Sequence, residues 1–152
     1  MKIAFASDHV GYPMKLELMK YVQSLGHETK DYGAFSTERT DYPIWGSAAA
    51  RAVASGEMDR GIVICGTGIG IGIAANKING IRCVTCSEPY SAELSRQHNN
   101  SNMLSMGARV IGEELAKMIV RIWLQTEYEG GRHQRRIDQL AELEEHQQIM
   151  LE

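Results

Sequence analysis

A cysteine followed by alternating glycines is the stretch of this sequence best suited to do chemistry. The β-branched segment 61–64 ends in Cys65, and four glycines alternate with other residues before a helix-like segment, 73–77. This order predicts a buried strand, a tight turn and the start of a helix. Backbone N–H groups in such a turn are open to a ligand, and a helix N-terminus favours a thiolate. Cys65 is therefore a candidate base beside an anion-binding turn, although a free cysteine is also often a plain core residue.

Two more ionisable side chains follow the first predicted strand. The apolar segment 2–7 leads into an exit loop, 8–11, which begins with Asp8 and His9. Ligands of parallel α/β sheets bind beyond the carboxyl ends of the strands, at a topological switch point. We therefore expect Asp8, His9 and Cys65 to lie at the same edge of one sheet.

The elements that must position these side chains alternate along the whole chain. Strands are predicted at 2–7, 27–32, 61–65, 81–86 and 103–106, and helices at 13–25, 44–54, about 73–78, 89–98, 113–126 and from about 132 onward. This alternation predicts an α/β protein of the three-layer Rossmann-like (flavodoxin-like) kind, with a five-stranded parallel sheet covered on both faces. The polar strand 27–32 suits an edge of that sheet.

Length and composition narrow the function classes. A chain of 152 residues fits one domain, 1–152, and a net charge of −3 argues against nucleic acid or a membrane surface as a partner. No apolar stretch approaches the roughly 20 residues that span a bilayer, and the N-terminus enters a strand without a signal-peptide pattern. We expect a cytoplasmic protein whose three cysteines are reduced.

Two motif-like patterns do not carry the functions that they suggest. The glycine turn fails the G-x-G-x-x-G fingerprint in both registers and has no G-K-[ST], so neither a dinucleotide nor a P-loop nucleotide is expected. Cys83 and Cys86 have redox-motif spacing, but they lie within a predicted strand. Residues three apart on a strand face opposite sides, about 10 Å apart, so they are expected to be structural thiols.

Histidines at positions 9, 98 and 133, with Cys65 and Asp8, are the only residues that suggest a metal site. None of the pairs has the close spacing of structural zinc ligands, so no metal is expected.

The last predicted helix begins with a pair of arginines. Arg132 and Arg136 are four residues apart and point from one face, which suits a phosphate or simply a solvated basic surface. A narrow apolar stripe, Ile137, Leu140, Leu143, Met150 and Leu151, continues along the same helix. The segment is too polar to be buried inside the domain, so residues from about 132 to 152 are expected to form a helix that lies on a partner subunit.

Several segments, taken together, resemble a known family. SDHVG at 7–11, ERTDYP at 38–43, CGTGIG at 65–70, SEPYS at 87–91, SRQHN at 95–99 and EGGRH at 129–133 resemble the ribose/galactose phosphate isomerases, which include type B ribose-5-phosphate isomerases and galactose-6-phosphate isomerase subunits. The resemblance extends over nearly the whole chain up to about Ile137, in the same order and spacing.

The resemblance implies a role for each matching residue. Cys65 matches the base that moves a proton between C1 and C2, and His98 matches the residue that opens the sugar ring together with Asp8. The turn matches the anion hole for the enediolate, formed by Gly66, Thr67, Gly68, Ile69 and Gly70, with the Thr67 hydroxyl beside it. The matching phosphate ligands are His9, Arg109, Arg132 and Arg136, while Asn99 contacts the sugar and Tyr42 lines the pocket.

The implied reaction is the interconversion of D-ribose 5-phosphate and D-ribulose 5-phosphate without a metal or organic cofactor. Isomerisation of a six-carbon aldose phosphate, such as allose 6-phosphate or galactose 6-phosphate, is the nearest alternative. A sugar-phosphate-binding or thiol-redox module without isomerase activity is a more distant one.

The predicted element order also bears on assembly. His98 and Asn99 follow a helix and precede a strand, which puts them at the amino edge of the sheet, away from Cys65. We therefore expect a homodimer, or a tetramer made of two such dimers, with each active site shared between two subunits.

Overall fold

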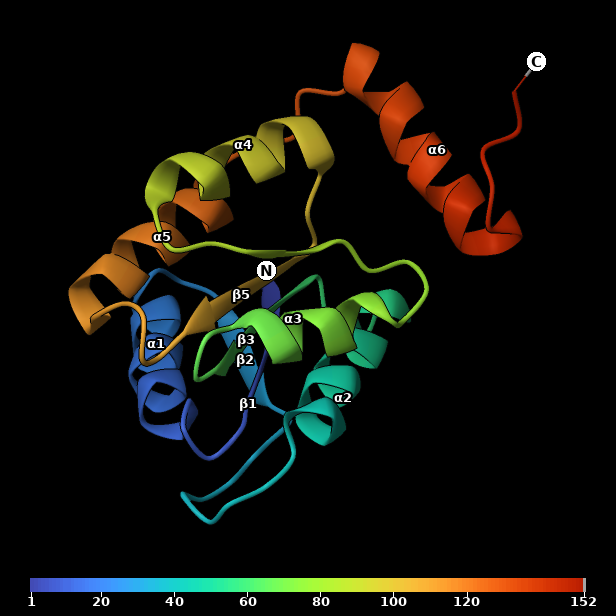
Figure 1. The fold of residues 1–152 in the computed structure, drawn as a ribbon. Helices are drawn as coiled ribbons and strands as arrows, with labels where there is room; N and C mark the ends of the chain where they lie inside the picture. The colour runs from blue at the N-terminus through green and yellow to red at the C-terminus, as the bar shows by residue number, and fades with distance from the viewer. Residues whose placement is uncertain (152) are drawn as a thin grey trace.

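The computed structural model describes residues 1–151 as a twisted sheet between two layers of helices (Figure 1). The strands are β1 (Lys2–Ser7), β2 (Glu28–Asp31), β3 (Arg60–Cys65), β4 (Cys83–Thr85) and β5 (Met103–Gly107). The helices are α1 (Tyr12–Ser24), α2 (Tyr42–Ala54), α3 (Ile69–Asn76), α4 (Pro89–Asn99), α5 (Glu113–Gln125) and α6 (Arg132–His146). The predicted three-layer α/β fold with a five-stranded parallel sheet is confirmed.

The strand order is β2-β1-β3-β5-β4, and every neighbouring pair is parallel. The polar strand β2 lies at an edge, as predicted. In the flavodoxin order β4 lies next to β3 and β5 at the edge, whereas here β5 lies next to β3 and β4 at the edge. The chain leaves β1 toward one edge and β3 toward the other, so the switch point lies between the carboxyl ends of these two strands.

Alternation along the strands divides the core into two clusters. Ile62 and Ile64 of β3 face the cluster built with α1, α4 and α5, whereas Val63 and Cys65 face the cluster built with α2 and α3. Three alanines of α2 are buried in the second cluster, Ala49, Ala50 and Ala52, and their small side chains let the helix approach the sheet closely. The sheet is thus held rigidly from both faces, and its carboxyl edge is a fixed platform for side chains.

Three predicted boundaries were wrong. The helix predicted from about residue 73 begins at Ile69, because the glycine turn ends at the N-cap, Gly68. The strand predicted over 81–86 is confined to Cys83–Thr85, because Ile81 belongs to a turn and the Arg82 N–H donates to the Asn102 side chain instead of a neighbouring strand. The last helix ends at His146, where Gln147 adopts a left-handed conformation. Met150 and Leu151 therefore do not continue the apolar stripe, and residue 152 lies outside the described part of the chain.

Helix α6 extends away from the three layers (Figure 1). Its far end is tied to the loop before β4, where the Glu144 carboxylate accepts the Gly80 N–H at 3.0 Å. Across residues 1–151, the helices are all too short or too polar to cross a membrane.

Candidate active site

A cavity of about 500 Å³ opens at the carboxyl ends of β1 and β3, where the topology predicts a ligand site. It is lined by Asp8, His9, Val10, Arg39, Tyr42, Cys65, Gly66, Thr67, Gly70 and Arg109. Residues distant in sequence thus meet at one place, and most of them are the predicted site residues. A groove of about 550 Å³ between α1 and α5 is slightly larger, but it lies away from the switch point and Lys117 on its wall is paired with Glu113 and Glu114.

Cys65 is the last residue of β3, and its side chain lies under the turn that starts α3. The residue is 5% exposed, and its Sγ accepts the Gly68 N–H at 3.2 Å. Gly68 is the N-cap of α3, so the positive end of that helix is directed at the sulfur. The Gly68 N–H and the first turn of α3 thus point at the sulfur, which lines the cavity, as a base that acts on a bound ligand must.

The turn itself provides donors next to the sulfur. The Thr67 hydroxyl accepts the Ile69 N–H at 3.2 Å, so the donors of Gly68 and Ile69 are both engaged within the turn. Neither residue is among those that line the cavity, whereas Gly66, Thr67 and Gly70 are. The Tyr42 ring lies over Gly70, where an added Cβ would stand 2.7 Å from the ring. The wall that faces a ligand is therefore formed by Gly66, Thr67 and Gly70, with Tyr42 packed against it.

Asp8 and His9 are held by backbone contacts from neighbouring loops. Asp8 is 7% exposed, and its Oδ1 accepts the Gly11 N–H at 2.9 Å, which fixes the carboxylate at the mouth of β1. The His9 Nδ1 accepts the Thr40 N–H at 3.2 Å. Because Nδ1 is then an acceptor, the proton of a neutral His9 ring is on Nε2, which suits donation to an anionic ligand.

Arg39 also lines this cavity, although the sequence patterns did not predict it as a site residue. It lies in a loop that follows β2 and carries no periodic pattern. The buried Lys15 ammonium anchors the start of this loop, since it contacts the Asp31 carboxylate at 2.7 Å and the Ala34 carbonyl oxygen. The only sequence signal for Arg39 was its place within the ERTDYP segment at 38–43.

Besides Gly68 and Ile69, four predicted site residues do not reach the cavity within one chain. His98 and Asn99 end α4 at the amino edge of the sheet, where Asn99 lines a separate groove with Arg82 and Cys83. Arg132 and Arg136 are exposed in the first turns of α6. The element order predicted this separation of His98 and Asn99 from Cys65.

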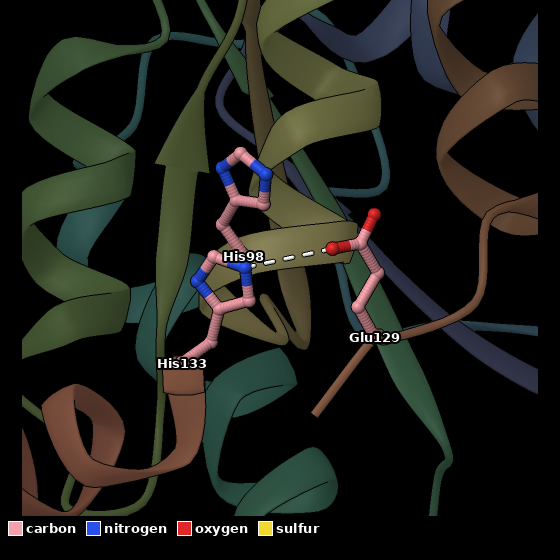
Figure 2. Close-up of side chains that lie close together, drawn as sticks. All are labelled: His98, Glu129 and His133. Carbon is pink, nitrogen blue, oxygen red and sulfur yellow. Dashed lines mark ion pairs between the residues drawn. The ribbon is translucent and has the colours of Figure 1, made fainter. Parts of the chain in front are cut away.

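His98 belongs instead to a cluster with His133 and Glu129 (Figure 2). The two imidazole rings are stacked, with centroids 4.3 Å apart and planes inclined by 16°. Their donor atoms and the Glu129 carboxylate lie within 4.8 Å of one another. Lone pairs of parallel stacked rings do not converge on one point, so this geometry is that of a stacked pair and not of two ligands to one metal ion.

The other two thiols lie apart from the cavity. Cys83 and Cys86 belong to opposite core clusters, as their spacing predicted. Burial raises the pKa of Cys83 to about 12 and that of Cys86 to about 11, so both remain protonated near neutral pH. They are not suited to resolve a disulfide with Cys65.

Comparisons with known proteins assign this chain to a family. Residues 3–140 match the model of the family described as Ribose/Galactose Isomerase. The chain is 58% identical over 144 residues to ribose-5-phosphate isomerase B of Escherichia coli (strain K12), covering 95% of this chain and 97% of that protein.

Solved structures show the same likeness. The ribose-5-phosphate isomerase B of Clostridium thermocellum superposes with a TM-score of 0.94 at 50% identity, covering 95% of this chain and 98% of that one. The ribose-5-phosphate isomerase B of Mycoplasma genitalium, solved with bound ribulose-5-phosphate, gives 0.91 at 35% identity, covering 95% and 97%. By sequence and fold, the chain belongs to the ribose/galactose isomerase family.

Proposed function

We propose that the protein interconverts D-ribose 5-phosphate and D-ribulose 5-phosphate through a cis-enediolate, with Cys65 as the base. The observation that carries this proposal is the position of Cys65, which lines the cavity and whose Sγ accepts the Gly68 N–H at 3.2 Å. The family membership and the relatives named ribose-5-phosphate isomerase B support the same substrate. Together they assign an aldose–ketose isomerase whose chemistry is a proton transfer.

The Cys65 thiolate takes the proton from C2 of the open-chain aldose, and negative charge develops on the oxygen at C1. The same thiol then returns the proton to C1, while a proton moves from the C2 hydroxyl to the C1 oxygen, and the ketose forms. No atom is gained or lost in this exchange. Donors at Gly66, Thr67 and Gly70 face the developing oxygen charge, and such donors contribute most when they are fixed before the reaction.

The phosphate is held away from the reacting carbons. His9, Arg39 and Arg109 line the cavity and supply donors for a dianion. Binding energy from this remote group orients C1 and C2 at the thiolate.

A second copy of the chain completes the site. In the proposed assembly, His98 of the partner subunit opens the furanose ring with Asp8, Asn99 of the partner subunit contacts the sugar, and the partner's Arg132 and Arg136 bind the phosphate. The proposed dimer interface would bury apolar side chains that are exposed in the single chain. They are Ile69 and Ile73 on α3 and Leu140 and Leu143 on α6. A tetramer would pair two such dimers, and the mass in solution distinguishes the two states.

Mixed dimers test the shared site. Cys65→Ala and His98→Ala proteins are each expected to turn over ribose 5-phosphate about 100-fold or more slowly than wild type, whereas a mixture in which subunits have exchanged should regain part of the activity. A hybrid dimer has one site with both mutations and one with neither, so up to about a quarter of the wild-type rate per total subunit is expected. No recovery despite exchange verified by native mass spectrometry would contradict the shared site.

A six-carbon aldose phosphate is the second candidate substrate, because the matching family model covers ribose and galactose isomerases together. Side-by-side kcat/KM values for ribose 5-phosphate, allose 6-phosphate and galactose 6-phosphate separate the two. We expect the pentose to be preferred, and a higher kcat/KM for a hexose would reassign the substrate. We also place the protein in the cytoplasm, where its three free, buried thiols remain reduced.

A further inference from the structure

His133 is a buried polar residue to which the reaction proposed above gives no role. It is 5% exposed, lies second in α6, and its Nε2 makes no hydrogen bond within residues 1–151. The nearest acceptor is the Glu129 Oε2 at 3.5 Å, close enough for electrostatic attraction but too far for a good hydrogen bond. A buried polar atom in this state calls for an explanation, because leaving it unpaired costs about 1–3 kcal/mol.

The backbone brings His133 to His98 by a tight turn. Gly130 and Gly131 have φ values of 66° and 59°, which side-chain-bearing residues rarely adopt, and they reverse the chain between Glu129 and His133. The Glu129 N–H donates to the Gln97 carbonyl oxygen at 3.1 Å, which attaches this turn to the last turn of α4. His98 is the next residue of that helix, so its ring meets the His133 ring face to face.

The remaining contacts hold the end of α4 and do not involve the His98 ring. The Arg96 guanidinium contacts the Asn100 side chain and the Ser101 carbonyl oxygen, and these contacts fix the end of α4. The orientation of the His98 ring about its own side-chain bonds is limited by His133 on one face, with Glu129 beside it (Figure 2).

We propose that His133 is a positioning residue: its ring holds the His98 imidazole by stacking in the orientation that opens the sugar ring, and Glu129 holds His133. This inference rests on the proposed function, because it assigns His98 to ring opening. General acid–base groups contribute about 10²–10⁴-fold, and loss of orientation forfeits part of that factor. We expect a His133→Asn variant, which keeps a polar side chain but lacks a ring, to lower kcat for ribose 5-phosphate by about 10- to 100-fold.

A His133→Phe variant keeps a flat ring for stacking and should retain most of kcat. Arg135→Ala is the matched control, since Arg135 is exposed on the same helix and has no place in the proposed site. Equal losses in the Asn and Phe variants, both folded, would overturn the role of the ring.

A double-mutant cycle asks whether His133 acts through His98. If it does, the His98→Ala/His133→Asn protein should be no slower than His98→Ala alone, because the His98 ring that His133 orients is already absent. Multiplicative losses would show that His133 acts independently and would overturn the proposal.

Deuterium exchange into the ketose, ribulose 5-phosphate, tests the proposed function separately from the role of His133. Ribulose 5-phosphate has its 5-oxygen blocked by phosphate and cannot form a furanose, so deuterium exchange at its C1 needs the base but no ring opening. We expect wild type, His98→Ala and His133→Asn to exchange C1 at similar rates, while ribose 5-phosphate turnover falls in the two variants. Absence of exchange in wild type would refute the proposed function, whereas an equal fall of exchange and turnover in His133→Asn would refute only the positioning role.

Discussion

Replacing Gly68 by alanine should damage catalysis far more than it damages the fold. Gly68 has a φ of +81°, and an alanine Cβ would stand 2.7 Å from the carbonyl carbon of Met106, a backbone atom that cannot rotate aside. The left-handed conformation costs a residue with a side chain about 1–2 kcal/mol, and overpacking adds about 1–3 kcal/mol. The turn must shift to relieve the contact, which moves the Gly68 N–H away from the Cys65 sulfur.

Gly56→Ala is the matched control, because Gly56 has a φ of +83° and an alanine Cβ there would have nothing within 4 Å. Thermal unfolding should show a loss of about 1–2 kcal/mol in Gly56→Ala, which corresponds to a few degrees in Tm, and a larger loss in Gly68→Ala. The shifted turn also carries the donors at Gly66, Thr67 and Gly70, which line the cavity. Loss of one such fixed donor typically lowers kcat by about 10²–10³-fold, and we expect that fall only in Gly68→Ala. A folded Gly68→Ala protein with kcat within threefold of wild type would refute the role assigned to this turn.

Two further predictions concern side chains at and away from the cavity. Arg39→Ala should raise KM for ribose 5-phosphate and lower kcat/KM by about 10- to 100-fold with little change in kcat, because a charge-assisted contact contributes about 1.5–3 kcal/mol; an unchanged KM in steady-state assays would exclude Arg39 from binding. Burial raises the pKa of Cys83 from the ordinary 9.0 to about 12. Between these two pH values, the Cys83 thiol is protonated in the folded chain and ionised in the unfolded chain. The part of the free energy of unfolding due to Cys83 should therefore be fully present below pH 9 and decline as pH rises toward 12. Denaturant titrations of wild type and Cys83→Ala should differ in slope against pH over this window, and parallel curves would contradict the assignment.

The position of the site could be predicted from the sequence because it depends on a general property of parallel sheets. Asp8 follows the apolar strand β1, and Cys65 is the last residue of the apolar strand β3. The two strands are parallel neighbours at the switch point, so their exit loops lie at the same edge of the sheet. The same property separates His98, which follows a helix, from Cys65.

Other features depend on contacts that no local pattern encodes. The loop that carries Arg39 is attached to distant parts of the chain, by Lys15 at its start and by the bond from the Thr40 N–H to His9. The stacking of His98 on His133 depends on two consecutive left-handed glycines and on the attachment of that turn to α4. These are tertiary arrangements, and the periodicity of strands and helices does not contain them.

The Cys65 thiolate is proposed to move the proton between C1 and C2, and every other role in the site depends on this step. Its most direct test is the incorporation of solvent deuterium at C1 of ribulose 5-phosphate, followed by NMR for wild type, Cys65→Ala and Cys65→Ser after each variant is confirmed to be folded. We predict exchange in wild type and a fall of about 10²- to 10⁴-fold in both variants, the contribution expected of a positioned base. Exchange in Cys65→Ala within tenfold of wild type would contradict this role and assign the base to another residue.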